Sequence, residues 1–236
     1  MDYPKISIIT VSYNGKDFIE KTIKSVLSQK YSNIEYIIID GGSTDGTLDI
    51  IRKYSEHLTF WLSEPDCGIY DAMNKGLEHV SGEWVNFMNV GDEFVNDRTL
   101  VNVFSRELPS DVKVVYGNTL NDFGSYTNVH KAEDAAVLRD RLAFSHQASF
   151  VSTSFYWRFN LEYKIAADYD LFYSVFDKFG EKAFFNTGVE IAKYKADDGF
   201  SLANTGSMSS EYIKIRARKK NLRWYKDFFK LMLNQK

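Results

Sequence analysis

Four groups of polar residues, each directly after a short apolar run, are the parts of this sequence best suited to chemistry. They are Ser12-Tyr13-Asn14, Asp40-Gly41-Gly42, Glu64-Pro65-Asp66 and Asn89-Val90-Gly91-Asp92. Any one group alone is typical of a turn or a helix cap, where Asp, Asn, Ser and Gly are common. Acids that converge on one crevice repel each other unless they bind a cation or hydrogen-bond donors, and hard divalent metals prefer carboxylate oxygens. Together the four groups favour a site for a cation and a polar ligand.

A second acidic motif, Ala167-Asp168-Tyr169-Asp170, opens a stretch with helical periodicity. Aspartate at a helix start is favourable in itself, by about 0.3–1 kcal/mol through the helix dipole, so these acids are either helix-stabilising or catalytic. Two positions along a helix correspond to about 200° of rotation, which predicts different roles for Asp168 and Asp170. His146, in the segment SHQASF, is either a structural histidine or part of an acceptor or diphosphate site, with Gln147 beside it.

The first hundred residues contain the elements that must position these groups. Apolar runs at residues 6–11, 35–40, 58–63 and 84–88 predict buried strands, and helical patterns separate them. Strands that alternate with helices predict βαβ units, and so a Rossmann-like α/β fold with a mostly parallel central sheet flanked by helices. Ligands of such sheets bind beyond the carboxyl ends of the strands, near the switch point in strand order. All four polar groups follow the carboxyl end of a predicted strand.

After Asp92 the alternation loosens. The patterns predict a helix at 97–107, a strand at 112–116, a hairpin or long loop at 118–130, a strand at 145–152 and a helix at 168–179. With no repeat and no low-complexity linker, we expect one mixed α/β domain with a variable second half and a helical tail.

Composition narrows the class of protein. The chain has 236 residues, 44% hydrophobic and 26% charged, which excludes a disordered or collagen-like protein. A single cysteine permits no internal disulfide, and no apolar run approaches the ~20 residues that span a bilayer. The first residues lack the pattern of a signal peptide. We therefore expect a cytoplasmic protein.

The charge is unevenly distributed along the chain. Nine Lys or Arg residues and two acids lie between residues 211 and 236, a net charge of +7, which leaves −10 on residues 1–210. In that basic segment Trp224, Phe228, Leu231 and Met232 recur at helical spacing. Such an amphipathic helix either packs on the domain or binds an anionic membrane surface as a peripheral element. Because the body is acidic, we expect no nucleic-acid partner.

Two common nucleotide sites do not fit this sequence. The turn SYNGKDF has one glycine where a dinucleotide site has G-x-G-x-x-G, and GGSTDGT has no lysine after its last glycine, as a Walker A loop requires. What remains is Tyr13 after the first strand and Asp40 after the second. This pair could stack a base and accept a hydrogen bond from its N–H group.

Two long segments resemble the family-2 glycosyltransferases with the GT-A fold. They are TVSYNGKDFIEKTIKSVLSQKYSNIEYIIIDGGSTDGT and SEPDCGIYDAMNKGLEHVSGEWVNFMNVGDE, and the resemblance covers residues 5–100 strongly and the rest loosely. It implies a nucleoside-diphosphate sugar donor, often a UDP-sugar, bound at the carboxyl ends of the strands, with Mn²⁺ or Mg²⁺ bridging the diphosphate. The residues that it implies for donor binding are Val11, Tyr13, Asp40, Asp66, Asn74, Lys75 and Asn89, with Asp92 as the metal ligand.

The resemblance also selects Asp168 as the catalytic base, because similar enzymes carry theirs in an acidic motif at a helix start. It would take the proton from an acceptor hydroxyl as the oxygen attacks the anomeric carbon, and such direct displacement inverts the configuration. Residues 1–100 would form the nucleotide-sugar-binding half, 101–205 the acceptor and catalytic half, and 206–236 the basic C-terminal helix.

The metal motif departs from many relatives, which carry more aspartates. Here Asn89-Val90-Gly91-Asp92 keeps one carboxylate, which can still hold a divalent ion if the diphosphate and waters complete its shell. We therefore expect an inverting transferase that acts on a saccharide or lipid-linked acceptor in surface polysaccharide biosynthesis. A motif with a single carboxylate also leaves open the alternative that the protein is a non-catalytic nucleotide-sugar-binding or scaffolding subunit. A nucleotidyltransferase would need a glycine-rich, basic loop after the first strand, which SYNGKDF lacks.

Overall fold

A computed structural model describes residues 3–195 and 208–220. The strands are β1 (Ile6–Ser12), β2 (Ile34–Asp40), β3 (Phe60–Ser63), β4 (Trp84–Phe87), β5 (Glu93–Phe94), β6 (Val114–Asp122), β7 (Thr127–His130), β8 (Ser149–Ser152) and β9 (Phe184–Lys195). The helices are α1 (Lys16–Leu27), α2 (Thr47–Lys53), α3 (Ile69–Leu77), α4 (Thr99–Phe104) and α5 (Ala167–Phe179), with a further helix at 208–220. Short 3₁₀ helices lie at Ser55–His57, Ala135–Arg139, His146–Ala148 and Glu181–Ala183.

The first half of the sheet is parallel, as the alternation of strands and helices predicts. The order β3-β2-β1-β4 places β1 between β2 and β4, and all three pairings are parallel. The chain thus moves from β1 to β2 and β3 on one side and returns to β4 on the other, which makes the β1–β4 border the switch point. The carboxyl ends of β1 and β4 meet there, so the groups at Tyr13 and Asn89 are neighbours in space.

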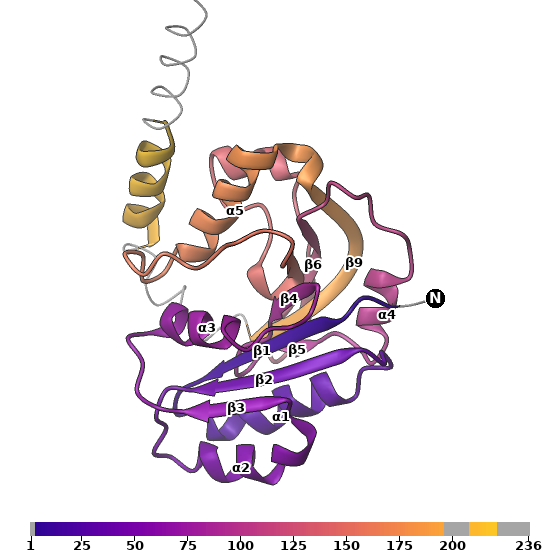
Figure 1. Cartoon of the computed structure of the whole chain (residues 1–236), viewed down its shortest axis with the longest axis vertical. Helices are drawn as coiled ribbons and strands as arrows, with labels where there is room; N and C mark the ends of the chain where they lie inside the picture. The colour runs from indigo at the N-terminus through magenta and orange to yellow at the C-terminus, as the bar shows by residue number, and fades with distance from the viewer. Residues whose placement is uncertain (1–2, 196–207, 221–236) are drawn as a thin grey trace, which may run out of the picture.

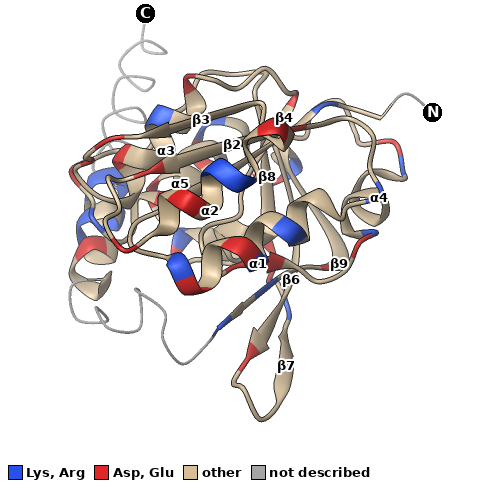
Figure 2. Ribbon diagram, turned by 90° about the horizontal axis from the view of Figure 1, so that it is seen from below, with Lys and Arg blue, Asp and Glu red and all other residues tan. Residues whose placement is uncertain are grey.

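The second half of the sheet is mixed and extends the order through β8, β6, β9 and β5. Strand β8 runs antiparallel to β4 and to β6, while β9 is parallel to β6. The segment at 118–130 is a hairpin between β6 and β7, which projects from the body (Figure 2). The sequence patterns did not predict β5 or β9, the latter a strand of 12 residues.

Helices cover both faces of the sheet (Figure 1). Alternate residues of each central strand face opposite sides, so Ile6 and Ile8 pack with α1, α2 and α4 in one core. Ile9 and Val11 pack with α3 and α5 in the other. Helix α3 lies close to the sheet at Gly76, where a Cβ would stand 2.7 Å from Cγ2 of Ile9. This close approach fixes α3, and with it Tyr70, over the carboxyl end of β1.

The described part of the basic C-terminal segment packs on the domain. Ile215 in helix 208–220 is fully buried, and the ring of Tyr212 lies 4.4 Å from that of Tyr169 in α5, measured between centroids. Of the predicted amphipathic helix, the part that holds Trp224 and Phe228 lies outside the described residues. Within the described ranges, no helix is long and apolar enough to cross a membrane.

Candidate active site

Asp168 lies in the first turn of α5 with its carboxylate almost buried, 7% of the residue being exposed. Its Oδ1 accepts a hydrogen bond from the main-chain N–H of Tyr169 at 2.7 Å and lies 3.3 Å from the hydroxyl of Tyr70 in α3. Its Oδ2 lies 3.3 Å from Nδ1 of His146. The predicted base is thus held by side chains from two other parts of the chain.

His146 connects Asp168 to the end of β4. The side-chain amide of Asn89 lies 3.1 Å from Nε2 of His146. If Nδ2 of Asn89 donates to Nε2, the ring proton of a neutral imidazole is on Nδ1, which then donates to Asp168. The turn that carries His146 is anchored by Asn86 in β4, whose Nδ2 donates to the carbonyls of Gln147 and Ser149 at 2.9 Å each.

Asp92 belongs to the same cluster. Its N–H donates to the carbonyl of Asn89 at 2.9 Å, which closes a turn in which Gly91 has a φ of +95°. Burial raises the pKa of the Asp92 carboxyl to about 7, although the nearby His146 and a hydrogen bond from Gln147 oppose the rise. A carboxyl with this pKa readily gives up its proton when a cation binds beside it. The structure therefore brings Asn89, Asp92, His146 and Asp168 together at one end of the sheet.

Two oxygen atoms of this cluster are of the kind that binds a divalent cation. In the described part of the chain no group of three or more His, Cys, Asp and Glu side chains is placed to hold a metal ion. However, Oδ1 of Asn89 is buried without a hydrogen-bond partner among the described residues, and the carboxylate of Asp92 lies in the same turn. Oxygen atoms are the ligands that Mg²⁺ and Mn²⁺ prefer. A cation held here would take its remaining ligands from a diphosphate and water.

Of the residues expected to bind the nucleotide base, some are exposed and others are buried. Tyr13 is 65% exposed just beyond β1. Asp40 is fully buried, and its carboxylate accepts hydrogen bonds from the main chain of Gly42 and Ser43 and from the hydroxyls of Ser43 and Ser63. Both oxygens of Asp40 are thus engaged in the turn after β2, and its contact with the nucleotide base stays a prediction. The side chain of Val11 is likewise buried in the core.

Asp66, unlike the buried Asp40, lies at the surface near Tyr13. A Cβ added at Gly41 would clash with Oδ2 of Asp66 and would lie 3.4 Å from the ring of Tyr13. Its other oxygen, Oδ1, accepts from the N–H of Gly68 at 2.9 Å. The missing side chain at Gly41 therefore lets the carboxylate of Asp66 lie beside Tyr13, an arrangement that the sequence alone did not reveal.

Asn74 and Lys75 are engaged within the protein. The amide of Asn74 donates to the carbonyl of Phe159 and accepts from its N–H, both at 2.9 Å. Nζ of Lys75 lies 2.7 Å from Glu64 and donates to the carbonyl of Pro65 at 2.9 Å. Asn74 thus anchors the segment at Phe159, and Lys75 anchors the loop that carries Asp66.

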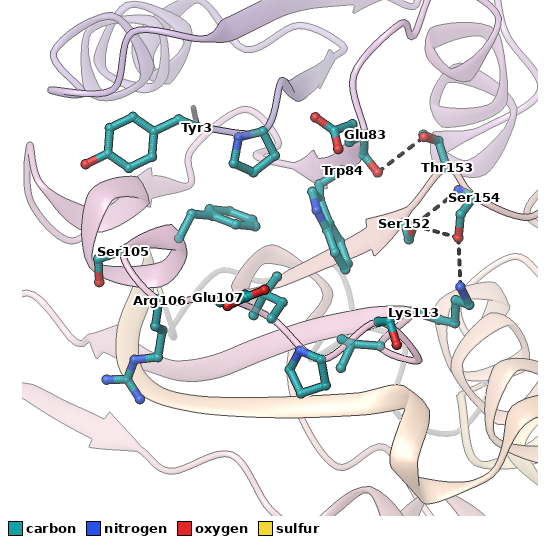
Figure 3. A pocket seen from close by; sticks show the side chains of 16 residues that line it. Tyr3, Glu83, Trp84, Ser105, Arg106, Glu107, Lys113, Ser152, Thr153 and Ser154 are labelled. Atoms are coloured by element: carbon teal, nitrogen blue, oxygen red, sulfur yellow. Dashed lines mark hydrogen bonds between the residues drawn. The ribbon is translucent and has the colours of Figure 1, made fainter. Parts of the chain in front are cut away.

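A separate cavity of about 780 Å³ lies at the opposite end of the strands. It is lined by residues such as Trp84 at the start of β4 and Ser152 at the end of β8 (Figure 3). None of the predicted site residues lines it. The titratable cluster, and not this hollow, is therefore the candidate active site.

Relatives in sequence are glycosyltransferases by name. An uncharacterized glycosyltransferase of Mycobacterium tuberculosis, Rv1514c, is 33% identical over 175 residues, which cover 70% of this chain and 66% of the relative. The putative teichuronic acid biosynthesis glycosyltransferase TuaG of Bacillus subtilis is 41% identical over 98 residues, 40% of this chain and 39% of TuaG. The chain thus spans just under two thirds of the length of the Mycobacterium relative.

Solved structures share the fold at low sequence identity. Mannosyltransferase PcManGT from Pyrobaculum calidifontis, in complex with GDP-Man and Mn²⁺, has a TM-score of 0.68 at 17% identity and covers 93% of this chain and 65% of its own. S. aureus TarS 1-349, in complex with UDP-GlcNAc, has a TM-score of 0.66 at 18% identity, over 84% of this chain and 60% of TarS. The fold is therefore that of the GT-A glycosyltransferases.

The sequence profile of one family covers most of the described domain. Glycosyl transferase family 2 matches residues 7–193, from the second residue of β1 to the last part of β9. The match contains the polar groups at the strand ends, His146 and Asp168. The chain belongs to glycosyl transferase family 2.

Proposed function

We propose that the protein is an inverting glycosyltransferase that uses Asp168 as its general base and a UDP-sugar as its donor. The observation that carries this proposal is the position of the Asp168 carboxylate, between His146 and Tyr70 and next to the turn of Asn89 and Asp92. A base adjoining a cation and diphosphate site is what direct displacement at an anomeric carbon requires.

The donor would lie across the carboxyl ends of β1 and β4. The exposed ring of Tyr13 would stack on the uracil, and the carboxylate of Asp66 would accept from its N–H. Asp92 and Oδ1 of Asn89 would hold a divalent cation, which supplies positive charge against the charge that develops on the leaving diphosphate. The structure of TarS with UDP-GlcNAc and that of PcManGT with GDP-Man and Mn²⁺ support this choice of ligands.

In the transfer step, Asp168 takes the proton of an acceptor hydroxyl while the oxygen forms a bond to the anomeric carbon. The bond from that carbon to the diphosphate oxygen breaks, and UDP leaves with the electron pair. The N–H of Tyr169, together with His146 when its ring proton is on Nδ1, would hold the carboxylate in place for the acceptor. His146 thereby links the base to the diphosphate side of the site through Asn89.

We propose a saccharide or lipid-linked acceptor of surface polysaccharide biosynthesis, reached from the cytoplasmic side. The biosynthetic role in the name of TuaG supports this class, and the net charge of +7 on residues 211–236 suits an anionic membrane surface.

The decisive test is the variant Asp168→Asn, which keeps the shape but removes the basic oxygen. A thermal-shift panel of UDP-sugars with and without Mn²⁺ first finds the donor, because a ligand specific to the folded state raises its Tm. With that UDP-sugar, we expect UDP release to fall by a factor of about 10² to 10⁴, the usual range for a lost general base, while the Tm shift with UDP stays the same. Wild-type turnover in the variant would contradict the assignment of the base. Nucleotide binding without UDP release by the wild type would indicate the non-catalytic subunit.

A further inference from the structure

The carboxylate of Glu211, in helix 208–220, receives three main-chain hydrogen bonds from one stretch of the chain. Its Oε1 accepts from the N–H of Lys164 at 2.8 Å, and its Oε2 accepts from Ile165 at 3.0 Å and Ala166 at 2.9 Å. Ala166 is the residue before α5. The carboxylate therefore lies at the entrance of the helix that carries Asp168, where negative charge is also favoured by the helix dipole.

One of these three residues also contacts the surroundings of Asp168 directly. The carbonyl of Ile165 accepts a hydrogen bond from the hydroxyl of Tyr70 at 2.7 Å, and the same hydroxyl lies 3.3 Å from Oδ1 of Asp168. A peptide unit held by Glu211 thus determines where the hydroxyl of Tyr70 points. Because that hydroxyl has a single proton, a shift of the Ile165 carbonyl would change what Asp168 receives from it.

Helix 208–220 also contacts Asp170, two residues after Asp168 in α5. Arg218 forms an ion pair with Asp170 at 2.5 Å, and Nζ of Lys219 lies 3.6 Å from the same carboxylate oxygen. The side chain of Asp170 is 9% exposed, so the pair is well shielded from water. Helix 208–220 therefore contacts α5 and its entrance both before and after Asp168.

We propose that Glu211 is a positioning residue for Asp168, which makes helix 208–220 a working part of the catalytic site. This inference rests on the proposed role of Asp168 as the base. Glu211 acts through the main chain of residues 164–166 and through Tyr70, and none of its hydrogen bonds within the described residues reaches the turn of Asn89 and Asp92 or the surface at Tyr13. It should affect the chemical step and leave donor binding alone.

The test compares Glu211→Ala and Glu211→Gln with the wild type, using the UDP-sugar that stabilises the wild type most. We expect kcat for UDP release to fall 10-fold or more in Glu211→Ala and by a smaller factor in Glu211→Gln, which keeps an acceptor oxygen and the volume. KM for the donor should stay within 2-fold of the wild-type value. The Tm shift with UDP should be similar to that of the wild type. Hydrogen exchange at the amides of residues 164–166 should become faster in both variants.

Arg216→Ala is the matched control, because Arg216 also holds helix 208–220, by donating to the carbonyl of Asp140 at 2.9 Å. It should leave kcat near the wild-type value. An equal loss of kcat in this control would mean that docking of the helix matters in general and would overturn the proposal. Wild-type kcat in both Glu211 variants, alongside an inactive Asp168→Asn, would refute the role of Glu211 alone. Turnover retained by Asp168→Asn would instead refute the proposed base.

Discussion

At the scale of single residues, the two ends of the site depend on different kinds of carboxylate. Asp168 is buried and restrained by neighbours, as its proposed role as the base requires. Asp66 is partly exposed beside Tyr13 because Gly41 leaves room for it. The buried Asp40 holds the turn that follows β2. Because Gly41 has no side chain, the acid that lies beside Tyr13 is Asp66, while Asp40 is buried.

We expect Asp66→Ala to weaken UDP binding about 10-fold, or about 1.4 kcal/mol, in the range of a hydrogen bond to a charged group. Calorimetric titration with UDP measures this. Asp71→Ala is a fair control, because Asp71 also accepts one main-chain hydrogen bond in this loop, from Cys67. Equal losses in both variants would show that the loop, and not the carboxylate of Asp66, matters for binding.

At the scale of elements, one buried acid joins the amino end of the parallel strands to the loop before β4. Glu35 in β2 accepts hydrogen bonds from the hydroxyl of Ser7 in β1, from Ser81 and from Nζ of Lys5. Burial alone would raise the pKa of Glu35, but these donors outweigh it and lower the pKa from 4.5 to about 2. The ionised carboxylate therefore stabilises the fold.

This shift predicts a loss of stability in acid. The folded pKa lies below the unfolded one, so the contribution is complete above about pH 4.5 and is lost as the pH falls toward 2. A shift of this size corresponds to roughly 3 kcal/mol. Urea unfolding from pH 7 to pH 3 should show a shallower decline for Glu35→Gln than for the wild type. Glu78→Gln, at an exposed site, should follow the wild type; parallel curves for all three proteins would contradict the role of Glu35.

The parallel half of the sheet could be predicted from sequence because its strands are continuous apolar runs, such as residues 6–11, separated by amphipathic helices. Strand β9 could not, because Asn186, Thr187 and Gly188 interrupt its apolar residues and a register shift accompanies them in the pairing with β6. Asp168 and His146 could be singled out as residue types. Their contact depends on the antiparallel return through β8, which short-range patterns do not encode.

The contacts of Glu211 and Tyr70 could not be predicted for a related reason. Glu211 accepts hydrogen bonds from main-chain groups, which carry no signature in the sequence. Tyr70 lies in a segment that resembles the family, yet nothing in its spacing points to a residue 98 positions away.

At the scale of the whole molecule, some of the basic residues near the C-terminus form ion pairs within the fold. Of the nine basic residues between 211 and 236, Arg218 and Lys219 are paired with Asp170. Figure 2 shows acidic and basic residues interspersed over α1 and α2, so the body presents no single-sign face there. Of the other seven basic residues between 211 and 236, Lys214, Arg216 and Lys220 lie in helix 208–220, and four more lie outside the described residues.

The net charge of +7 on residues 211–236 predicts binding to anionic membranes. We expect the protein to sediment with vesicles of phosphatidylserine and phosphatidylcholine and to be released by high salt, because each basic residue near such a surface contributes about 1 kcal/mol that salt screens. The triple variant of Arg223, Lys226 and Lys230 to Gln should bind less. Equal binding to pure phosphatidylcholine vesicles would point to apolar contacts in place of charge.

The site is assembled from Tyr13, Asn89, His146, Asp168 and Glu211, which are spread along most of the described chain. Domains generally fold as units during synthesis, and the residues of this candidate site come from most of the one domain that the described chain forms. The candidate site is therefore complete only after residue 211 has left the ribosome.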